Sequence, residues 1–550
     1  MDEVSVLIGG KAGDGINSAG LMVAQLLNHL GYRIYLYIDY PSLIRGGHNY
    51  AIIRGGERDV GTCRNHVDFV LALNEETLER HKEKYTQKTV FIANKDLVKN
   101  SDHGIPVKAI LAGENAPEIM GNSALLGGFA KVAGIDWEVV DTVFRRHIPK
   151  GADQNLAVAK KAFDLFDPVL PIKKCQNRPQ SLVSGNEAIG LGLIRGGLEA
   201  YVSYPMTPSS GILHFLAVEK ERFGLTVVHP ENEIAVILMA LGFAYAGKKA
   251  AVGTSGGGFC LMTEGLSLAG MAEIPVVLVV SQRTGPSTGL PTYSGQSDLQ
   301  FVLHAGQGEF PRLIIAPGDA REAMNWSERS MAVAWQCQCP AFILSDKTLS
   351  EGIYSLDPEA ARKQPASEVS LWDGKIPYRR YENTGSGISP LAFPGRKDTV
   401  VKVNSYMHDE AGITAEDADL TDRIAEKRLK KWETLIRVMQ DSPAVSLSGI
   451  PGASTALLCW GSTKGVCEEA AAELGLRVVR PVVLAPFPVD QIKKALTGVN
   501  RLIVVEENLT AQLSALAQRH GIIAHEEILR YDGRPFTVED LVTRVKEAGI

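Results

Sequence analysis

The hydrophobic and polar positions of the chain predict strands that alternate with helices. An apolar run at residues 4–8 is followed by a glycine-rich segment at 9–15 and by a helical pattern over about 17–29. Further strands are predicted at 33–38, 69–73 and 89–92. Strands that alternate with helices favour a parallel α/β unit, and prolines near residue 170 mark its end.

The same alternation returns in residues 182–355 and again in the last hundred residues. Between about 356 and 445, prolines and glycines interrupt it, and a charged run at 426–433 is predicted to be the solvated face of a helix. The helix predicted at 231–246 is apolar on all sides, which is typical of a buried helix. The pattern therefore predicts an α/β fold with three α/β domains.

Composition excludes several classes of protein. The 550 residues are 45% hydrophobic and 22% charged, which is ordinary for a globular protein. The net charge of -6 is spread over both signs and favours no nucleic-acid partner. The longest apolar run, 234–247, is shorter than the ~20 residues that a membrane span needs. No secretory signal is evident, so we expect a cytoplasmic protein without membrane contact.

The cysteines predict neither a disulfide framework nor a metal cluster. Only Cys337 and Cys339 are close in sequence, and their spacing lacks the second pair that a zinc or iron–sulfur site needs. We expect the thiols to pack in the core and the chain to hold no metal of its own.

The glycine-rich segment 9–15 lies between a predicted strand and a helix, where backbone N–H groups can bind phosphate. It does not match the Gly-x-Gly-x-x-Gly pattern of dinucleotide-binding folds. Its Gly13-Asp14-Gly15 resembles the start of the magnesium motif of thiamine-diphosphate enzymes, but residues 38–45 contain no asparagine to complete that motif. The segment predicts no metal site, and its ligand stays open.

A second loop contains Arg45, two glycines and His48 after a proline. Arginine suits carboxylates and phosphates because its planar guanidinium can donate two parallel hydrogen bonds. The loop predicts an anion site, with a tight turn and a solvated arginine as the alternative.

Two further loops follow predicted strands, at the end of a parallel sheet where ligands bind. Loop 204–210 holds Thr207 between two prolines, and its alternative role is a helix N-cap. Loop 283–292 gathers prolines, glycines and hydroxyl residues around Arg283, which favours anion binding over a plain surface turn.

Glu231 and Glu233 begin the apolar helix at 231–246. Glutamates in a first helical turn usually interact with the helix dipole and with water. Because the helix that follows is apolar on all sides, a glutamate at its start is predicted to face a protein interface.

These clusters, in this order and spacing, resemble the pyrimidine-binding domain of the 2-oxoacid:ferredoxin oxidoreductases. The matching stretches are 204–210, 231–235, 254–259 and 283–289. The first 170 residues are similar to the gamma unit of the family, and the last hundred to its transketolase C-terminal-like domain. The implied domains are a gamma-type domain, a pyrimidine-binding domain, an irregular connecting segment and a transketolase C-terminal-like domain, at 1–175, 182–355, 356–450 and 451–550.

Two departures from the family pattern stand out. Met206 replaces the usual isoleucine, which conserves volume. Residues 11–15 replace a commoner Gly-Gly-Gln-Gly type of loop, so the resemblance does not identify the ligand of that loop.

The resemblance implies roles for named residues. Glu233 is implied to hydrogen-bond the aminopyrimidine of thiamine diphosphate, and Thr207 and Arg283 to bind the substrate carboxylate. The implied cofactor-binding residues are Tyr204, Pro205, Met206, Thr207, Glu233, Thr254 and Ser255. The implied substrate or coenzyme A residues are Arg45, His48, Arg283, Ser287 and Thr288.

The resemblance also implies partners and a reaction. A beta subunit is expected to carry the Mg²⁺–diphosphate site and the [4Fe-4S] cluster, in an (αβ)₂ assembly that reduces ferredoxin. The expected reaction converts 2-oxoglutarate and coenzyme A to succinyl-CoA, or runs as the reverse carboxylation. The alternatives are pyruvate or branched-chain 2-oxoacids as substrate, a thiamine enzyme without ferredoxin, and a non-catalytic nucleotide-binding subunit.

Overall fold

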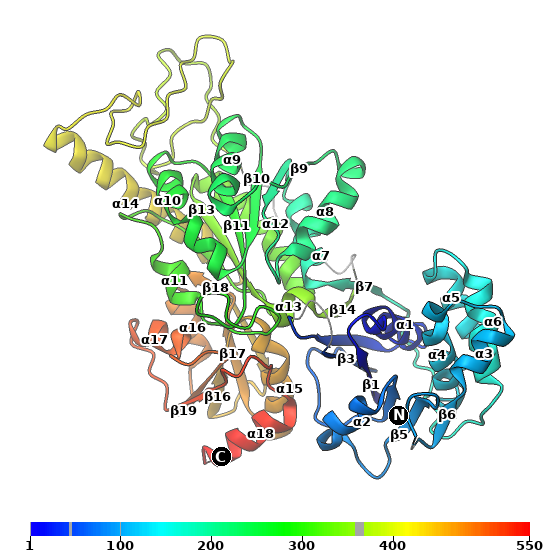
Figure 1. The fold of residues 1–550 in the computed structure, drawn as a ribbon. Coiled ribbons are helices and arrows are strands. Elements are labelled where there is room, and N and C mark those ends of the chain that lie inside the picture. The colour runs from blue at the N-terminus through cyan, green and yellow to red at the C-terminus, as the bar shows by residue number, and fades with distance from the viewer. Residues whose placement is uncertain (1, 43–46, 100, 358–367, 550) are drawn as a thin grey trace. The chain divides into compact units, whose positions relative to one another are not determined.

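The computed structural model describes residues 2–42, 47–99, 101–357 and 368–549. They form two compact units (Figure 1). Unit 1 comprises the described residues of Met1–Val183, Glu351–Pro358 and Phe536–Glu547, and unit 2 those of Ser184–Ser350, Glu359–Pro535 and Ala548–Ile550. No helix among the described residues is long and apolar enough to cross a membrane.

Unit 1 contains an eight-stranded sheet of order β6-β5-β4-β1-β3-β2-β14-β7. Its strands are β1 (Glu3–Lys11), β2 (Arg33–Asp39), β3 (His48–Gly56), β4 (Phe69–Ala72), β5 (Val90–Asn94), β6 (His103–Ile105), β7 (Ser181–Ser184) and β14 (Ile353–Leu356). The strands β1, β4, β5 and β6 are parallel neighbours, but β3 pairs antiparallel with both β1 and β2. The expectation of a parallel unit is therefore wrong for this half of the sheet, because it missed β3.

The strand β3 is hard to predict from sequence because an arginine interrupts its apolar stretch. This residue, Arg54, is only 2% exposed. The Arg54 guanidinium donates from Nε to Glu3 of β1 at 2.7 Å. A charged residue can be buried when it is paired in this way, but no local pattern predicts the pairing.

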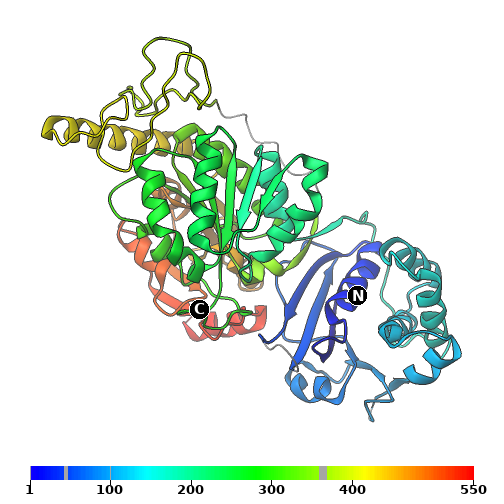
Figure 2. The ribbon, with the colours of Figure 1, turned by 45° about the horizontal axis from the view of Figure 1, so that its top comes forward.

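The helices of unit 1 are α1 (Ile16–His29), α2 (Glu75–Arg80), α3 (Val107–Gly113), α4 (Gly121–Val132), α5 (Trp137–His147), α6 (Ala152–Phe163) and α18 (Val538–Glu547), with 3₁₀ turns η1 (Lys82–Lys84) and η2 (Glu118–Met120). Helix α1 packs on β2 and β3, and α4 packs against α6 (Figure 2). The apolar faces of these helices and the sheet form one core.

Unit 2 contains a seven-stranded sheet of order β18-β12-β13-β11-β10-β8-β9. Its strands are β8 (Ala200–Ser203), β9 (Thr226–Val228), β10 (Ala250–Thr254), β11 (Val276–Gln282), β12 (Leu313–Ile315), β13 (Pro340–Asp346) and β18 (Val483–Ala485). All neighbours are parallel except β12 and β18. Every residue of β11 and β13 is buried, which explains their nearly continuous apolar sequences.

Helices flank this sheet in Figure 2. They are α7 (Gly185–Arg195), α8 (Ser210–Phe223), α9 (Glu233–Tyr245), α10 (Gly256–Met271), α11 (Leu299–His304), α12 (Ala320–Cys337) and α13 (Lys347–Glu351). Helix α9 is not buried on all sides as expected, because Ile234, Leu238 and Met239 are each almost half exposed.

The last hundred residues add a five-stranded sheet of order β15-β17-β16-β19-β20. Its strands are β15 (Val445–Gly449), β16 (Thr455–Leu458), β17 (Arg477–Pro481), β19 (Arg501–Glu506) and β20 (Glu526–Leu529). Its helices are α15 (Lys464–Leu474), α16 (Val489–Ala495) and α17 (Gln512–Gln518), with the 3₁₀ turn η3 (Gly461–Thr463). Three sheets flanked by helices confirm the α/β class.

The charged run at 426–433 lies in the long helix α14 (Ala418–Gln440), which runs beside the looped segment before it (Figure 1). The expectation of a solvated helix face is wrong for two of its lysines. Lys427 and Lys431 are buried, and both donate to the buried carboxylate of Glu273. The paired carboxylate lies 154 residues away from Lys427 in sequence, beyond the reach of local pattern analysis.

Candidate functional site

The loop at 204–209 connects the carboxyl end of β8 to α8. The hydroxyl of Ser203, the last residue of β8, donates to the carbonyl of Gly253 in β10 at 2.8 Å. The hydroxyl of Ser209 donates to the carbonyl of Met206 at 2.8 Å and closes the loop on itself. Tyr204 is partly exposed, with its ring against that of His229. These hydrogen bonds fix the loop at the carboxyl ends of the parallel strands, where β10 ends at Thr254.

Glu233 begins α9 from a fixed position. The Asn232 side chain caps the helix by accepting from the backbone N–H of Ala235 at 3.0 Å. Glu231 is exposed, whereas only 4% of Glu233 is exposed. The Oε1 atom of Glu233 is buried and has no hydrogen-bond partner among the described residues. A buried carboxyl oxygen without a partner is costly, so this atom is available to a donor from outside the chain.

The Glu233 carboxyl packs against the amino end of α10, where a glycine leaves room for it. Gly258 lies in the first turn of α10, and a Cβ added there would overlap with Oε1 of Glu233 and with the Thr254 hydroxyl. Thr254 and Ser255 are fully buried, and the Ser255 hydroxyl has no partner among the described residues. No side chain among the described residues caps this helix. Its free N–H groups and dipole favour a negatively charged or electron-rich ligand.

Arg283 follows β11 and reaches the loop after β8. Its Nη1 donates to the carbonyl of Thr207 at 2.8 Å, so the structure brings these two predicted residues together. Its Nε is buried and has no acceptor among the described residues. Burial lowers the pKa of Arg283, and the nearby Asp298 opposes that shift. Ser287 and Thr288 lie exposed on the same loop.

Asp298 is a further residue of this site, which sequence reasoning missed. A Cβ added to Gly256 would lie 2.7 Å from Oδ1 of Asp298, so the carboxyl lies against the first residue of α10. Burial raises the pKa of Asp298 to about 6, although Arg283 acts to lower it. In sequence this residue resembles an ordinary cap of the short helix α11, and no local signal distinguishes it.

The two glycine-containing loops of unit 1 meet at one end of the β1–β3 pair. Lys11 pairs with His48 in the sheet, and the N–H of Ala12 donates to the carbonyl of Gly47 at 3.1 Å. Arg45 lies outside the described residues. His48 is buried, and its Nε2 lies 2.9 Å from Nε2 of His81. The His48 ring is therefore not a surface group, and its Nδ1 lacks a partner among the described residues.

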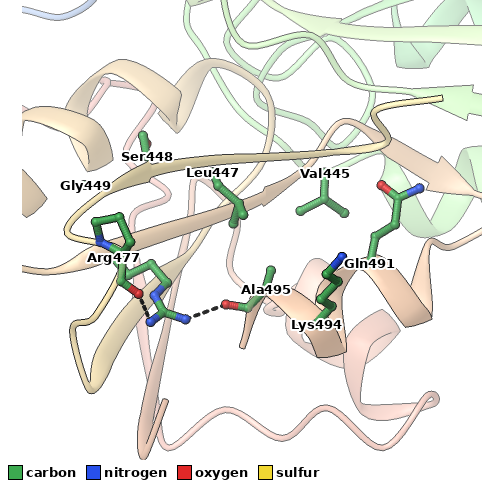
Figure 3. Close-up of a pocket in the computed structure, with 9 residues that line it drawn as sticks. Val445, Leu447, Ser448, Gly449, Arg477, Gln491, Lys494 and Ala495 are labelled. Atoms are coloured by element: carbon green, nitrogen blue, oxygen red, sulfur yellow. Dashed lines mark hydrogen bonds between the residues drawn. The ribbon is translucent and has the colours of Figure 1, made fainter. Parts of the chain in front are cut away.

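A cavity of about 500 Å³ lies apart from all these residues, at the β15 edge of the five-stranded sheet (Figure 3). Val445 and Leu447 of β15 line it opposite Gln491 and Lys494 of α16. Arg477 donates to the carbonyl of Ala495 at 2.7 Å. None of the predicted site residues that the structure describes lines this cavity. Among the described residues, no group of three or more histidine, cysteine or acidic side chains is placed to hold a metal ion.

Comparison with known proteins matches nearly the whole chain. Residues 191–427 match the family described as "Pyruvate flavodoxin/ferredoxin oxidoreductase, thiamine diP-bdg", and residues 5–165 match "Pyruvate ferredoxin/flavodoxin oxidoreductase". The 2-oxoacid:ferredoxin oxidoreductase subunit alpha of Sulfolobus sp is 30% identical over 98% of this chain and 96% of that protein. The 2-oxoglutarate synthase subunit KorA of Archaeoglobus fulgidus is 28% identical over 60% of this chain and 88% of that protein.

The comparison with solved structures includes a match over the full length. The 2-oxoglutarate:ferredoxin oxidoreductase from Magnetococcus marinus, solved with 2-oxoglutarate, coenzyme A and succinyl-CoA bound, has a TM-score of 0.91 and 29% sequence identity. The match covers 100% of this chain and 99% of that chain.

Proposed function

This chain belongs to the 2-oxoacid:ferredoxin oxidoreductase family, and from that premise we propose that it is the thiamine-diphosphate-binding alpha subunit of an enzyme that converts 2-oxoglutarate to succinyl-CoA. Electrons pass to ferredoxin in this proposal, and coenzyme A accepts the acyl group. Thiamine-diphosphate chemistry is common to the members of this family, whereas 2-oxoglutarate as the substrate of this chain is our proposal.

The observation that carries the proposal is the environment of Glu233. Its buried Oε1 has no partner among the described residues, and glycine at 258 lets this carboxyl lie against the amino end of α10. The nitrogen atoms of an aminopyrimidine ring can donate or share a proton, so the ring can supply the hydrogen-bond partner that the Glu233 carboxyl lacks. The residues present therefore fit the cofactor. When bound, thiamine diphosphate supplies the electron sink for decarboxylation.

The side chains of this chain supply binding and proton control. Glu233 is proposed to hold a proton at the ring nitrogen of the cofactor, since a buried carboxyl is suited to sharing one. Thr254 and Ser255 are proposed to flank the same ring from the amino end of α10. Tyr204, Pro205 and Met206 are proposed to line it from the loop after β8.

Arg283 and Thr207 are proposed to bind the carboxylate of the 2-oxoacid. The Nη1 atom of Arg283 is already fixed by the Thr207 carbonyl, and its buried Nε still lacks an acceptor among the described residues. A substrate carboxylate would complete the hydrogen bonds of this guanidinium. Ser287 and Thr288, exposed on the same loop, are proposed to contact the substrate or coenzyme A.

A second subunit is proposed to complete the site. Ile234 and Leu238 of α9 line one pocket together with Leu261 of α10, and these three residues, here called the apolar face, are 46–49% exposed. Exposed apolar patches of this kind mark protein interfaces. We propose that a beta subunit covers this apolar face and carries the Mg²⁺–diphosphate site and the iron–sulfur cluster, in an (αβ)₂ assembly.

The 2-oxoglutarate substrate is supported by two relatives. The Magnetococcus marinus enzyme binds 2-oxoglutarate and coenzyme A, and the Archaeoglobus fulgidus relative is a 2-oxoglutarate synthase subunit. A second carboxylate needs a second cation, and the sequence offers Arg45 and His48 as candidates. His48 is buried against His81, so we propose Arg45. Replacing Arg45 by alanine should raise KM for 2-oxoglutarate and leave KM for pyruvate unchanged. Equal kinetics for 2-oxoglutarate in both forms would remove Arg45 from this role.

The test of the whole proposal is coenzyme-A-dependent reduction of a low-potential dye. The chain is co-purified with its partner subunit and assayed in parallel with 2-oxoglutarate, pyruvate and 2-oxoisovalerate. Activity with 2-oxoglutarate alone is expected. Equal or better activity with pyruvate would overturn the substrate but keep the reaction. No reduction with any oxoacid, by a complex shown to contain thiamine diphosphate and intact clusters, would overturn the proposal.

A further inference from the structure

The loop after β11, residues 283–293 and here called the β11 loop, is closed at its base and exposed at its tip. At the base, the Thr284 hydroxyl donates to the carbonyl of Ser294 at 2.6 Å, and the N–H of Leu290 donates to the carbonyl of Thr284 at 2.9 Å. Residues 285–290 are exposed. Ordering each residue of such a loop costs conformational entropy, so the loop needs contacts from elsewhere to keep one conformation.

Those contacts come from a turn of the last hundred residues, at 530–534, here called the clamp turn. It follows β20 directly. The carbonyl of Gly533 accepts a hydrogen bond from the N–H of Ser294 at 3.0 Å. The Arg534 guanidinium lies over the ring of Tyr293, with Cζ 4.0 Å from the ring centroid, in a cation–π contact. The clamp turn thus contacts the β11 loop and the residue that follows it.

Glycine at 533 allows the close approach of the two segments. Its φ of 84° lies in the left-handed region. A Cβ at this position would be 3.0 Å from Cβ of Tyr293 and 3.2 Å from Cδ1 of Leu290. It would also be 3.4 Å from the hydroxyl oxygen of Thr284, which directly follows Arg283. The clamp turn therefore packs on the base of the β11 loop, one residue from Arg283.

The clamp turn is itself fixed to the five-stranded sheet. Oδ1 of Asp532 accepts from the N–H of Arg534 at 2.9 Å and from Nε of Arg530 at 3.0 Å. The N–H of Arg530 donates to the carbonyl of Glu506, the last residue of β19, at 3.0 Å. The turn can therefore act as a fixed support for a loop that follows a strand of the seven-stranded sheet.

We infer that Gly533 and Arg534 are positioning residues, because the clamp turn holds the β11 loop in the conformation that binds the 2-oxoacid. This inference rests on the proposed role of Arg283 in binding the substrate carboxylate. A loop released from the clamp turn binds substrate only in the fraction of molecules that keep this conformation, so the apparent affinity falls by that fraction. The chemistry of the bound state is unchanged, so the loss belongs to KM rather than to kcat.

The first test compares two glycines with positive φ in the complete complex with the partner subunit. Gly533→Ala should raise KM for 2-oxoglutarate at least about ten-fold and change kcat less than about two-fold, because the new Cβ displaces the β11 loop. Gly521 has a similar φ of 74°, but a Cβ there meets no atom of the described residues within 4 Å. Gly521→Ala carries the same backbone strain and should keep the natural KM. Dye reduction over a range of 2-oxoglutarate concentrations measures both constants.

The second test removes the cation–π contact at the surface. Arg534→Ala should raise KM for 2-oxoglutarate roughly five-fold, and Arg534→Lys, which keeps a cation for the ring, should restore most of the affinity. Adding Tyr293→Leu to Arg534→Ala should cause no further rise, because both changes remove one contact. The matched control is Arg519→Ala, which removes an arginine of the same domain that contacts His304 of α11 rather than the β11 loop. It should keep the natural KM.

Amide exchange reports on the loop without any turnover. In the complex without substrate, the amides of residues 284–293 should exchange roughly ten-fold faster in Gly533→Ala and in Arg534→Ala than in the natural protein. An unchanged KM in both variants, or a rise of the same size in Gly521→Ala, would overturn the inference. If the natural complex reduces no dye with any oxoacid, the proposed function fails. Faster exchange would then still support the clamp turn, and unchanged exchange would refute it.

Discussion

Lys427 donates two hydrogen bonds to the carboxylate of Glu273, at 2.6 and 2.8 Å, and both side chains are buried. Lys431 donates to the same carboxylate at 2.5 Å. Burial acts to raise the pKa of Glu273, but the two lysines and Arg380 outweigh it and hold that pKa far below its usual range. Burial also lowers the pKa of Lys427 to about 8. These charges hold α14 against the carboxyl end of α10.

Removing Lys427 should loosen α14 locally. Breaking an isolated buried ion pair from one side typically costs about 3 kcal/mol or more. Glu273 keeps Lys431 as a partner, so we expect a smaller loss of about 2 kcal/mol. In Lys427→Met, amide protection of α14 should therefore fall roughly thirty-fold in hydrogen–deuterium exchange. Lys430→Met changes a lysine of the same helix that is only partly buried, and it should leave the protection unchanged. Equal loss in both variants would contradict a specific role of the pair.

Gly258 should not tolerate a side chain, whereas Gly257 should. A Cβ at Gly258 would overlap with Glu233 and Thr254, but a Cβ at Gly257 has its nearest contact at 3.7 Å, with the carbonyl of Ser287. Gly258→Ala is therefore expected to weaken thiamine-diphosphate binding at least ten-fold by displacing the glutamate. Gly257→Ala should bind normally and gain up to about 1 kcal/mol of stability from the better helix former. Calorimetric titration of the complex with the cofactor measures both, and normal binding by Gly258→Ala would refute the close packing.

Glu233 and Glu231 should differ sharply despite being two residues apart. Glu233→Gln keeps the shape of the buried side chain but removes its ability to share a proton, and kcat should fall roughly 10²- to 10⁴-fold. Glu231→Gln, at an exposed position, should change kcat less than two-fold. Steady-state dye reduction at saturating cofactor measures the difference. Comparable losses in the two variants would exclude a specific role for the buried carboxyl.

The buried histidine pair should make unit 1 sensitive to acid. Burial, with His48 adding to it, lowers the pKa of His81 to about 3. The unfolded chain takes up this proton near pH 6.5, so the free energy of unfolding falls as pH drops from about 6.5 toward 3. At pH 5 this single group contributes a loss of about 2 kcal/mol.

His81→Phe removes the buried imidazole and should reduce that loss. The measurement is amide protection of β3 in hydrogen–deuterium exchange at pH 7 and pH 5, because a chain of several domains does not unfold in one step. His66→Phe, at an exposed position of the same unit, should retain the acid sensitivity of the natural protein. An unchanged acid response in His81→Phe would show that other groups cause it.

Sequence patterns by themselves determined much of this protein. Burial on both faces gives parallel strands nearly continuous apolar sequences, so the strand predicted at 69–73 is observed as β4 at Phe69–Ala72. The positions of the loops at 204–210 and 283–292 after predicted strands also followed from the order of residues along the chain, whereas the preference for Glu233 over Glu231 came from the family resemblance. These features are local, because each depends on residues within one strand–loop–helix segment.

Only the tertiary structure decided the features that depend on distant pairs. Arg54 is buried in β3 because Glu3 of the neighbouring strand pairs with it, and Lys427 is buried because Glu273 accepts its hydrogen bonds. Asp298 belongs to the site because Gly256 lets its carboxyl approach α10. A charged residue has the same local pattern whether it faces water or a buried partner. The free energy of burying a charged residue depends on its partner in the folded structure, and that partner lies far away in the sequence.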